Sequence, residues 1–583
     1  MRFLRRSAKD ADGSPKQAHS AAHPAAAQSR DKARPVLNAR AAMACYLMLA
    51  LAYLIGLGVP MLDGAAAGYA NTALSLHAEG IRAQVGTNGP PLLFWLSAFS
   101  FEMFGVNVVA YKLPSLLFSA LAVYSTVRVG AVLYNEDTGR LAGVILASAF
   151  ALLFAANNAD MDAILIGSVI FTTSQLMIFV TDTHKLAARA HLVVAGLGLA
   201  IGLAARGLPG VILPLFAVFL FLVYRLEWRK LFDPFWLLLP LSAFLFVFPL
   251  IYLWHEETGQ NGMAFIQWAQ SAEQLSAENP FLGEGMAERF FYYYTYLWAF
   301  LPWSAIALWA AASSAHRLVN DRYWPRARGE AVTLGVVVST FIYITVSQFH
   351  LLHYVTVLLP FFAVLLAGWL PARLRHPASY HWLWRVQYVV FALILDAALV
   401  FNGWMFPLHD WQTGIAALAL LALGIWFIPL WTRGSRLIIV TVSISTVFWL
   451  LANANLYPGL LENQAGTALG STAIRPDQRI NPDNIFCLDS EGPSASLNIA
   501  IREQAKPLTL DEISKRTGDG RETILFVTAE GREKISAYGL SFDVLASSPN
   551  YSNISLPRWK FLNPHTRKDE LRTAYLLRMK QQS

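Results

Sequence analysis

The sequence predicts an α-helical protein that crosses a membrane many times. Of its 583 residues, 55% are hydrophobic and 14% are charged, whereas a soluble domain carries about 25% charged residues. The mean hydropathy is +0.42, and the apolar residues gather in long runs that repeat along the chain. Runs of about 20 such residues are long enough to span a bilayer. The net charge of +7 is therefore interpreted as a topology signal rather than as a sign of nucleic-acid binding.

About thirteen apolar runs are candidate spans. The first run, from Ala41 to Met61, fits an uncleaved span better than the short core of a signal peptide. The two cysteines, Cys45 and Cys487, lie far apart in an apolar run and a polar tail, so no disulfide framework is expected. The candidate spans are 41–61, 107–132, 139–156, 163–181, 190–205, 208–224, 235–254, 290–314, 331–347, 354–371, 386–405, 414–431 and 436–454.

The basic residues predict the orientation of these spans. Lys and Arg gather in alternate loops, and opposite loops such as 348–353 and 406–413 contain neither. The positive-inside rule then places the N-terminus in the cytoplasm, and an odd number of spans places the C-terminal tail on the other side. The basic loop residues are Arg140, Lys185, Arg189, Arg225, Arg229, Lys230, Arg317, Arg322, Arg326, Arg328, Arg373, Arg375, Arg385, Arg433 and Arg436.

Three segments outside the spans have their own character. Residues 1–40 are basic and rich in Ala, Ser and Pro, which predicts disorder. In the first outer segment, "PPLLFWLSAFSFEMFG" (90–105) is too short for a span, and we expect a helix along the membrane surface. In the tail, "NIFCLDS", "ETILFVTAEG" and "TAYLLRM" predict strands, and "SLNIAIREQA" and "LDEISKRTG" predict helices. The tail is therefore predicted to be a small α/β domain.

Ionisable residues from separate segments fall at the outer ends of the spans. Such groups at membrane depth are expensive, and by default they indicate a functional site. Each one alone has a second explanation as a cap or a solvated side chain, but acids, a base and imidazoles on one face favour a shared site. These residues are Asp63 after the first span, Asp160 and Asp162 after the third, Arg206 after the fifth, and His350 and His353 after the ninth.

Several stretches between Tyr46 and Gly459 resemble the GT-C membrane glycosyltransferases in order and spacing, specifically the bacterial relatives of the aminoarabinose transferase and of the protein O-mannosyltransferases. The stretches are "YANTALSLHAEG", "PPLLFWLSAFSFEMFGVNVVAYKLPSLLFSAL", "GRLAGVILASAFALLFAANNADMDAILIG", "GLAARGLPGVILPLFAVFLFLV", "FFYYYTYLWAFLPW" and "SQFHLLHYVTVLLPFFAVLLAG".

The resemblance implies a GT-C fold with about 13 transmembrane helices, juxtamembrane helices in the first outer loop and a small extracytoplasmic α/β domain. The chain would then divide into a cytoplasmic N-terminus (1–40), a transmembrane domain (41–459) and a periplasmic domain (460–583). The implied place is the bacterial inner membrane. The implied donor is a sugar on an undecaprenyl-phosphate-type lipid. The implied acceptor is an envelope glycolipid, a polysaccharide or a protein, and no nucleic-acid partner is expected.

The resemblance also implies roles for the acids. Asp63 takes the place of the catalytic acid after the first span, although the relatives usually carry it nearer to the positions of Ala65 and Ala66. Asp162, or else Asp160, fits the second acid, after the third span. In this chemistry a carboxylate orients and deprotonates the acceptor hydroxyl.

The basic residues would bind the donor phosphate. Arg206, followed by Gly207, stands where relatives usually have lysine before glycine, and His350 replaces a basic residue after the ninth span, with His353 nearby. Arginine binds phosphate oxygens in a fork, and positive charge stabilises the leaving phosphate. Two Asp and two His are also potential ligands of a divalent metal ion, but their spacing matches no ligand pattern. No cofactor is required by the sequence.

One departure from the relatives weakens the case for activity. Their Glu-Lys-Pro before the surface helix is Asn88-Gly89-Pro90 here, so the lysine expected to hold the phosphate is missing. Arg82 and Lys112 are the candidates to replace it. The first alternative is therefore a catalytically degenerate relative that acts as a lipid-binding or partner subunit. The second is a lipid or glycan transporter, which would need polar groups near the bilayer midplane in broken helices.

Overall fold

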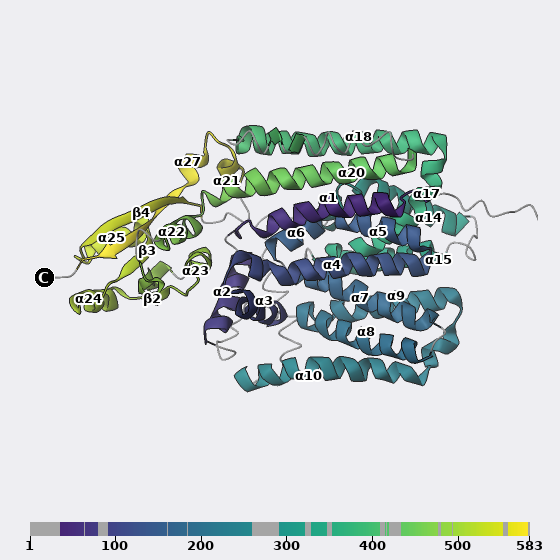
Figure 1. The fold of residues 1–583 in the computed structure, drawn as a ribbon, viewed down its shortest axis with the longest axis horizontal. Coiled ribbons are helices and arrows are strands. Elements are labelled where there is room, and N and C mark those ends of the chain that lie inside the picture. Colours follow the sequence, from purple (N-terminus) through teal and green to yellow (C-terminus); the bar gives the residue numbers. More distant parts are fainter. Residues whose placement is uncertain are drawn as a thin grey trace, which may run out of the picture. The chain divides into compact units, whose positions relative to one another are not determined.

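A bundle of long apolar helices and a small five-stranded sheet make up the described part of the protein (Figure 1). The computed structural model describes residues 35–62, 65–79, 91–159, 161–182, 185–258, 291–320, 328–346, 353–408, 414–415, 417–418, 433–475, 480–491, 494–551 and 558–580.

In these residues, seven helices are long and apolar enough to cross a membrane, or up to nine if each of two bent pairs counts as one span. Every predicted span except 414–431 coincides with a helix or a bent pair, and 414–431 lies largely outside the described residues. The number thirteen therefore stays a prediction. The seven are α1 (Ala39–Leu57), α4 (Val108–Leu133), α7 (Met161–Thr181), α8 (Lys185–Arg206), α10 (Leu238–Thr258), α18 (Pro377–Leu399) with η3 (Val400–Met405), and α20 (Arg433–Leu451) with η5 (Ala452–Leu456) and α21 (Tyr457–Leu461).

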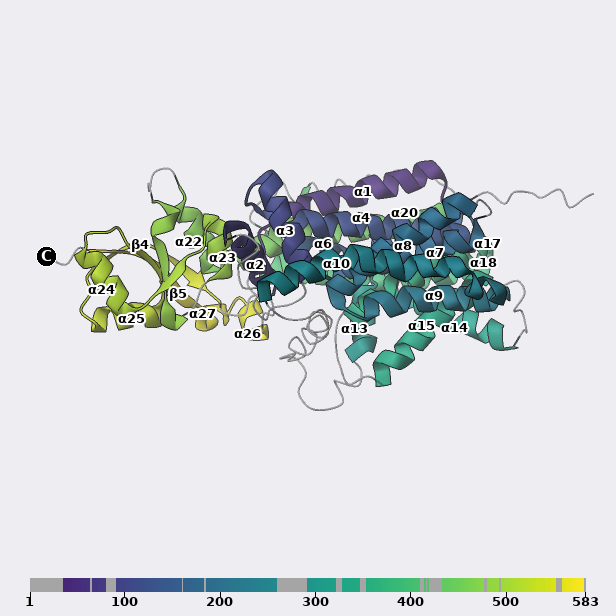
Figure 2. The ribbon, with the colours of Figure 1, turned by 90° about the horizontal axis from the view of Figure 1, so that it is seen from below.

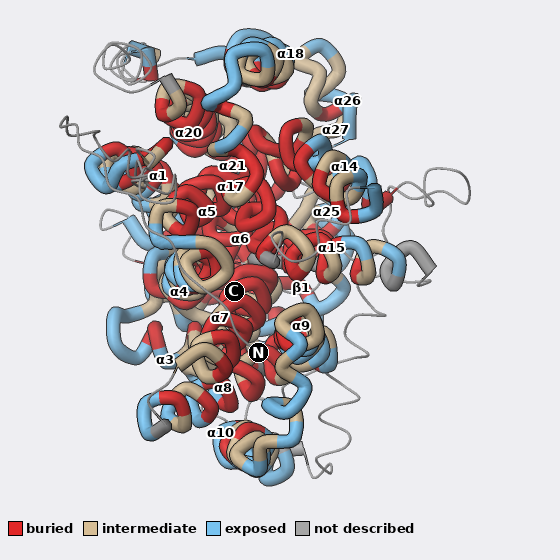
Figure 3. The backbone as a smooth tube through the Cα atoms, turned by 90° about the vertical axis from the view of Figure 1, so that its right-hand side faces the viewer, coloured by how far each residue is buried: buried red, intermediate tan, exposed pale blue. Residues whose placement is uncertain are grey.

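Helix α7 is the most deeply buried of the seven long helices. The helices α4, α7, α8 and α10 lie next to one another in that order (Figures 1 and 2). In its apolar window, 78% of α7 is buried in the protein, against 17% for the window that covers α10 (Figure 3). A helix that is apolar on all sides suits either protein or lipid neighbours. The shorter helices α9 (Pro209–Arg225), α15 (Arg328–Val346) and α17 (Leu359–Arg375) also belong to the described bundle.

Two bent pairs meet at their bends. The first pair is α5 (Glu136–Ala147) with α6 (Phe150–Asn158), bent by 57°, and the second is α13 (Phe291–Ala299) with α14 (Ser304–Asn320), bent by 116°. Backbone groups freed by a break inside a membrane need partners within the protein.

The two bends supply partners to each other. The Trp303 Nε1 donates to the Ser148 Oγ at 2.8 Å, and the Phe150 amide donates to the Leu301 carbonyl at 2.9 Å. The Ser445 hydroxyl donates to the Ser148 carbonyl at 2.8 Å. All these groups are neutral and are satisfied within the bundle, which favours a structural role for the bends over a transport path.

Helices α4 and α5 cross at glycines. A Cβ at Gly139 would lie 2.3 Å from the Val127 carbonyl oxygen and 2.9 Å from the Ala131 nitrogen, both of them backbone atoms. We expect Gly139→Val to force the two helices apart and to lower the free energy of unfolding by about 1–3 kcal/mol. Thermal unfolding in detergent measures the loss. Gly403→Val is the control, because a Cβ there meets nothing within 4 Å, and equal losses in both variants would contradict the prediction.

The first outer segment forms two helices, α2 (Ala65–Glu79) and α3 (Pro91–Phe104). The second coincides with the predicted juxtamembrane helix. It exposes the apolar side chains of Phe99, Met103 and Phe104, as expected of a helix that faces lipid.

The C-terminal strands β1 (Ile485–Leu488), β2 (Lys506–Leu508), β3 (Ile524–Thr528), β4 (Phe542–Asn550) and β5 (Arg572–Met579) form one sheet in the order β2-β1-β3-β5-β4. The pairs β1–β2 and β1–β3 are parallel, while β5 is antiparallel to both β3 and β4. The three predicted strands and two predicted helices are confirmed. The helices of this region are α22 (Ala465–Ala473), α23 (Ala495–Ile501), α24 (Leu510–Gly518), α25 (Ala529–Ala537), α26 (Trp559–Leu562) and α27 (Arg567–Glu570).

Candidate functional site

A buried ion pair joins the start of one central helix to the end of the next. The Arg206 Nη2 lies 3.2 Å from the Asp162 Oδ1, and the two residues are 8% and 3% exposed. The Thr356 hydroxyl, from the short helix α16 (His353–Thr356), donates to the Asp162 Oδ2 at 3.4 Å. The predicted acid and the predicted base are therefore in direct contact, at what we call the Asp162 end of the bundle.

Local sequence explains why both charges sit at helix ends. Asp162 lies in the first turn of α7 and Arg206 in the last turn of α8, so the positive N-terminus of one helix faces the acid and the negative C-terminus of the other faces the base. Gly207 follows α8 with a φ of 71°, a left-handed conformation that glycine adopts freely at a helix C-terminus. Pro209 then begins α9, as proline often does at a first helical position.

The remaining predicted site residues are only partly covered. Asp63, Asp160, Arg82 and His350 lie outside the described residues. His353 is the first residue of α16, the helix that also carries Thr356, but its side chain is not described. The structure therefore brings Asp162 and Arg206 together with the Thr356 side chain of α16.

Lys112 is a candidate replacement ligand for the donor phosphate, but its side chain contacts the end of α1. Its ammonium donates to the carbonyl oxygens of Gly56 at 2.9 Å and Val59 at 2.7 Å, and to the Asn157 Oδ1 at 3.3 Å. An ammonium has three donors, and these contacts use all of them. In this structure Lys112 therefore contacts protein acceptors, and its role as a replacement phosphate ligand stays a prediction. A signal was present in the sequence, since a lysine within an apolar run needs buried partners.

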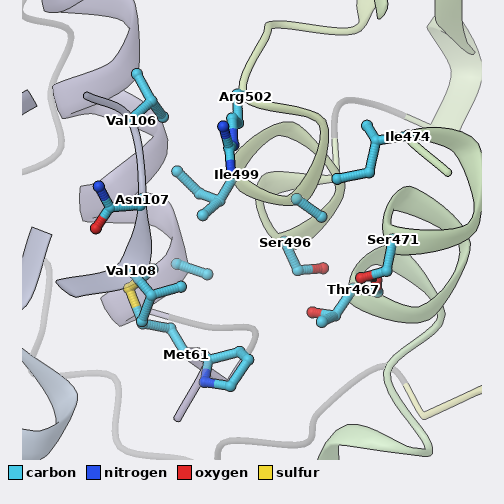
Figure 4. Close-up of a pocket in the computed structure, with 13 residues that line it drawn as sticks. Met61, Val106, Asn107, Val108, Thr467, Ser471, Ile474, Ser496, Ile499 and Arg502 are labelled. Carbon is cyan, nitrogen blue, oxygen red and sulfur yellow. Dashed lines mark hydrogen bonds between the residues drawn. The ribbon is translucent and has the colours of Figure 1, made fainter. Parts of the chain in front are cut away.

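A pocket of about 180 Å³ adjoins the segment that leads from α1 to Asp63 (Figure 4). Pro60 and Met61 line it on one side, and helices α22 and α23 on another. Sequence reasoning did not anticipate it, because it depends on how the C-terminal region meets the outer helices. The other lining residues are Ala67, Val106, Asn107, Val108, Thr467, Ser471, Ile474, Ser496, Ile499, Ala500 and Arg502.

The described side chains offer few ligands for a metal ion. Among the described residues, no group of three or more His, Cys, Asp or Glu side chains is placed to hold one. The Asp162 carboxylate already contacts a guanidinium, so a divalent cation bound there would lie beside a positive charge. The described residues thus do not fit a metal site.

Comparisons with known proteins agree with this architecture. Residues 88–254 match the family described as dolichyl-phosphate-mannose-protein mannosyltransferase. The structure of ArnT from Cupriavidus metallidurans bound to undecaprenyl phosphate is similar with a TM-score of 0.66, at 14% identity, over 92% of this chain and 97% of that one. The apo state of the same protein gives a TM-score of 0.65, at 16% identity, over 92% and 98%. A search of the curated proteins found no significant match.

The likeness to ArnT covers 92% of the chain, and the family match covers α3 to most of α10. At this identity the likeness establishes the fold. The protein is therefore a multi-pass membrane protein with the GT-C fold, and it resembles the aminoarabinose transferase and protein O-mannosyltransferase group.

Proposed function

We propose that the protein is a glycosyltransferase that moves a sugar from a polyprenyl-phosphate donor to an envelope glycolipid or polysaccharide. The observation that carries the proposal is the buried Asp162–Arg206 pair, which gives this fold a preorganised cation at one end of the bundle. The ArnT structure that the chain resembles was determined with undecaprenyl phosphate, which supports a lipid-phosphate donor. A protein hydroxyl is a further acceptor class.

In the proposed reaction, the acceptor hydroxyl oxygen attacks the anomeric carbon of the sugar. The bond between that carbon and the phosphate oxygen breaks, and the lipid phosphate leaves with the bonding electrons. Asp63 orients the hydroxyl and takes its proton. Arg206 stabilises the negative charge on the leaving phosphate, and Asp162 holds the guanidinium in place.

The other candidate site residues have supporting roles in the proposed reaction. His350, His353 and Arg82 contribute further donors to the phosphate, and Asp160 is the second candidate for the acid near Asp162. Histidine would make donor binding sensitive to pH near its usual pKa of about 6.5.

The proposed location is the bacterial inner membrane, with the N-terminus in the cytoplasm and the Asp162 end and C-terminal region on the periplasmic side. The alternation of basic loops supports this orientation. The acceptor would then receive the sugar after it has reached the outer surface of that membrane.

A second candidate function is a non-catalytic subunit that binds a lipid phosphate. Two observations favour it: Asn88 and Gly89 replace an acid and a lysine of the relatives, and Lys112 is engaged with protein acceptors. Such a subunit would bind the donor lipid without breaking the bond to the sugar.

Deletion of the gene tests the proposal in the cell. We expect mass spectrometry of envelope glycolipids and polysaccharides to show a species shortened by one sugar in the deletion strain. The wild-type gene should restore the full species. Unchanged envelope glycans would contradict the proposed activity, and a lost sugar that returns with the Asp63→Asn variant would favour the non-catalytic candidate.

A further inference from the structure

We propose that Lys112 and Gln464 are positioning residues that fix the chain leaving α1 and thereby hold the catalytic carboxylate of Asp63 in place. We call residues 56–62 the exit segment; Asp63 follows it directly. The inference rests on the proposed function of Asp63. It assigns a catalytic purpose to a buried lysine that contacts neither member of the ion pair and to a glutamine at the start of the C-terminal region.

Lys112 binds the exit segment from within the bundle. Its ammonium donates to the carbonyl oxygens of Gly56 and Val59, at 2.9 and 2.7 Å, and the residue is 1% exposed. Helix α1 ends at Leu57, so these carbonyls belong to its last turn and to the residues just beyond. The last carbonyls of a helix have no partner within it and carry its negative end. The C-terminal end of α1 is therefore a favourable environment for the buried Lys112 ammonium.

A neutral hydrogen-bond chain supports the lysine. The Asn157 Oδ1 accepts from Lys112 at 3.3 Å, and the Asn157 amide donates to the Asn453 Oδ1 at 2.8 Å. A Cβ added at Gly56 would lie 2.6 Å from the Asn157 Oδ1, so a glycine at this position permits the close approach. Helices α1, α4, α6 and η5 are thus tied together at the exit segment.

Gln464 binds the exit segment from the other side. Its side chain is fully buried, and its amide donates to the Met61 carbonyl at 3.1 Å and to the Thr467 hydroxyl at 2.8 Å. The residues on either side connect it to the C-terminal sheet. The Asn463 carbonyl accepts from the Tyr551 amide at 2.9 Å, and the Asn550 side chain accepts from the Ala465 amide at 3.2 Å.

Three carbonyls within six residues, those of Gly56, Val59 and Met61, are therefore held by side chains from two different regions. Met61 lies two residues before Asp63 and faces the pocket between the outer helices and the C-terminal region (Figure 4). A displacement of about 1 Å in a catalytic group costs about 100-fold in rate. Loss of either bond should accordingly slow the chemical step and leave donor binding unchanged.

The test compares kcat, KM and the Kd for undecaprenyl phosphate in three variants of the full-length protein: Lys112→Met, Gln464→Leu and the double variant. We expect kcat to fall by about 10- to 100-fold in each single variant, with the Kd within about twofold of the wild type. Because both residues act on one segment, the double variant should lose clearly less than the product of the two single losses.

Lys230→Met is the control at the opposite end of the bundle; the side chain of this lysine is 45% exposed and also pairs with the Glu227 Oε2 at 2.9 Å. The Lys230 ammonium also donates to a helix-end carbonyl, that of Val180 at 2.6 Å, but at the C-terminal end of α7, away from Asp162. We expect a wild-type kcat from this variant. Hydrogen–deuterium exchange gives a readout that does not depend on activity: the amides of 56–59, 61 and 62 should exchange faster in Lys112→Met and Gln464→Leu than in Lys230→Met.

Three results would overturn the inference. One is a wild-type kcat in Gln464→Leu, which decides the question even if Lys112→Met does not fold. The second is a weakened Kd that accounts for the whole loss in Lys112→Met, since Lys112 would then be a phosphate ligand. The third is unchanged exchange at 56–62 in both variants. If the wild type transfers no sugar, the proposed function fails, and the exchange measurement still decides whether these residues hold the segment.

Discussion

Arg206→Met should destabilise the protein by about 3–5 kcal/mol and abolish sugar transfer. The stability loss follows because the Asp162 carboxylate, 3% exposed, would stay buried without the guanidinium that now lies 3.2 Å away. Breaking a buried pair by removing one partner costs about this much. Thermal unfolding in detergent or nanodiscs measures the loss of stability, and a donor-dependent transfer assay measures activity.

A double variant separates stability from function. Replacing a whole buried pair by apolar residues is often neutral or stabilising, so Asp162→Leu with Arg206→Met should recover most of the lost stability. Activity should stay absent, because the leaving phosphate still lacks its cation. Recovery of activity together with stability would show that the pair only holds α7 against α8.

The matched control for this pair lies at the other end of the bundle. Arg317 and Glu330 join α14 to α15 at 2.9 Å, with side chains that are 37% and 13% exposed. This pair is less buried than Asp162–Arg206, so Arg317→Met should cost less stability than Arg206→Met. It should leave transfer unchanged.

Asp63→Asn should lower kcat by about 10²- to 10⁴-fold, the usual contribution of a positioned general base. The amide cannot take the proton of the acceptor hydroxyl, but it keeps the size of the carboxylate. Binding of undecaprenyl phosphate should therefore stay close to that of the wild type. Steady-state transfer and equilibrium lipid binding, measured on the same preparation, separate the two effects.

Glu102→Gln controls for loss of a carboxylate in the same outer segment. Glu102 lies in α3 with a side chain that is 77% exposed, and its nearest described charge partner is His77 at 3.5 Å. We expect its activity to match the wild type. Full activity of Asp63→Asn would remove Asp63 from the mechanism, and Asp160 would be the next carboxylate to change.

Much of the fold could be predicted because a membrane imposes a strong pattern. Apolar runs of span length identify helices such as α1, α4 and α7. The bends in α5–α6 and α13–α14 could not be located, since an apolar run looks the same whether the helix within it is straight or bent. Strand β4 was missed because "FDVLASSPN" ends in turn-forming residues and contains a bulge between Val544 and Ala546.

The site could be predicted only in part, because its contacts depend on how the helices pack together. Topology places Asp162 and Arg206 on one face, but their contact depends on α7 and α8 packing side by side. The bonds of Lys112 join residues far apart in the sequence, so spacing gives no hint of them. The family resemblance predicted that a lysine binds the donor phosphate. In this structure the Lys112 ammonium instead donates to carbonyl oxygens at the end of α1.

A structure of the protein with bound undecaprenyl phosphate tests the central claim most directly. The account predicts that the phosphate lies at the Asp162 end, within hydrogen-bond distance of the Arg206 guanidinium and beside the segment that carries Asp63. A phosphate bound elsewhere, out of reach of both residues, would contradict it.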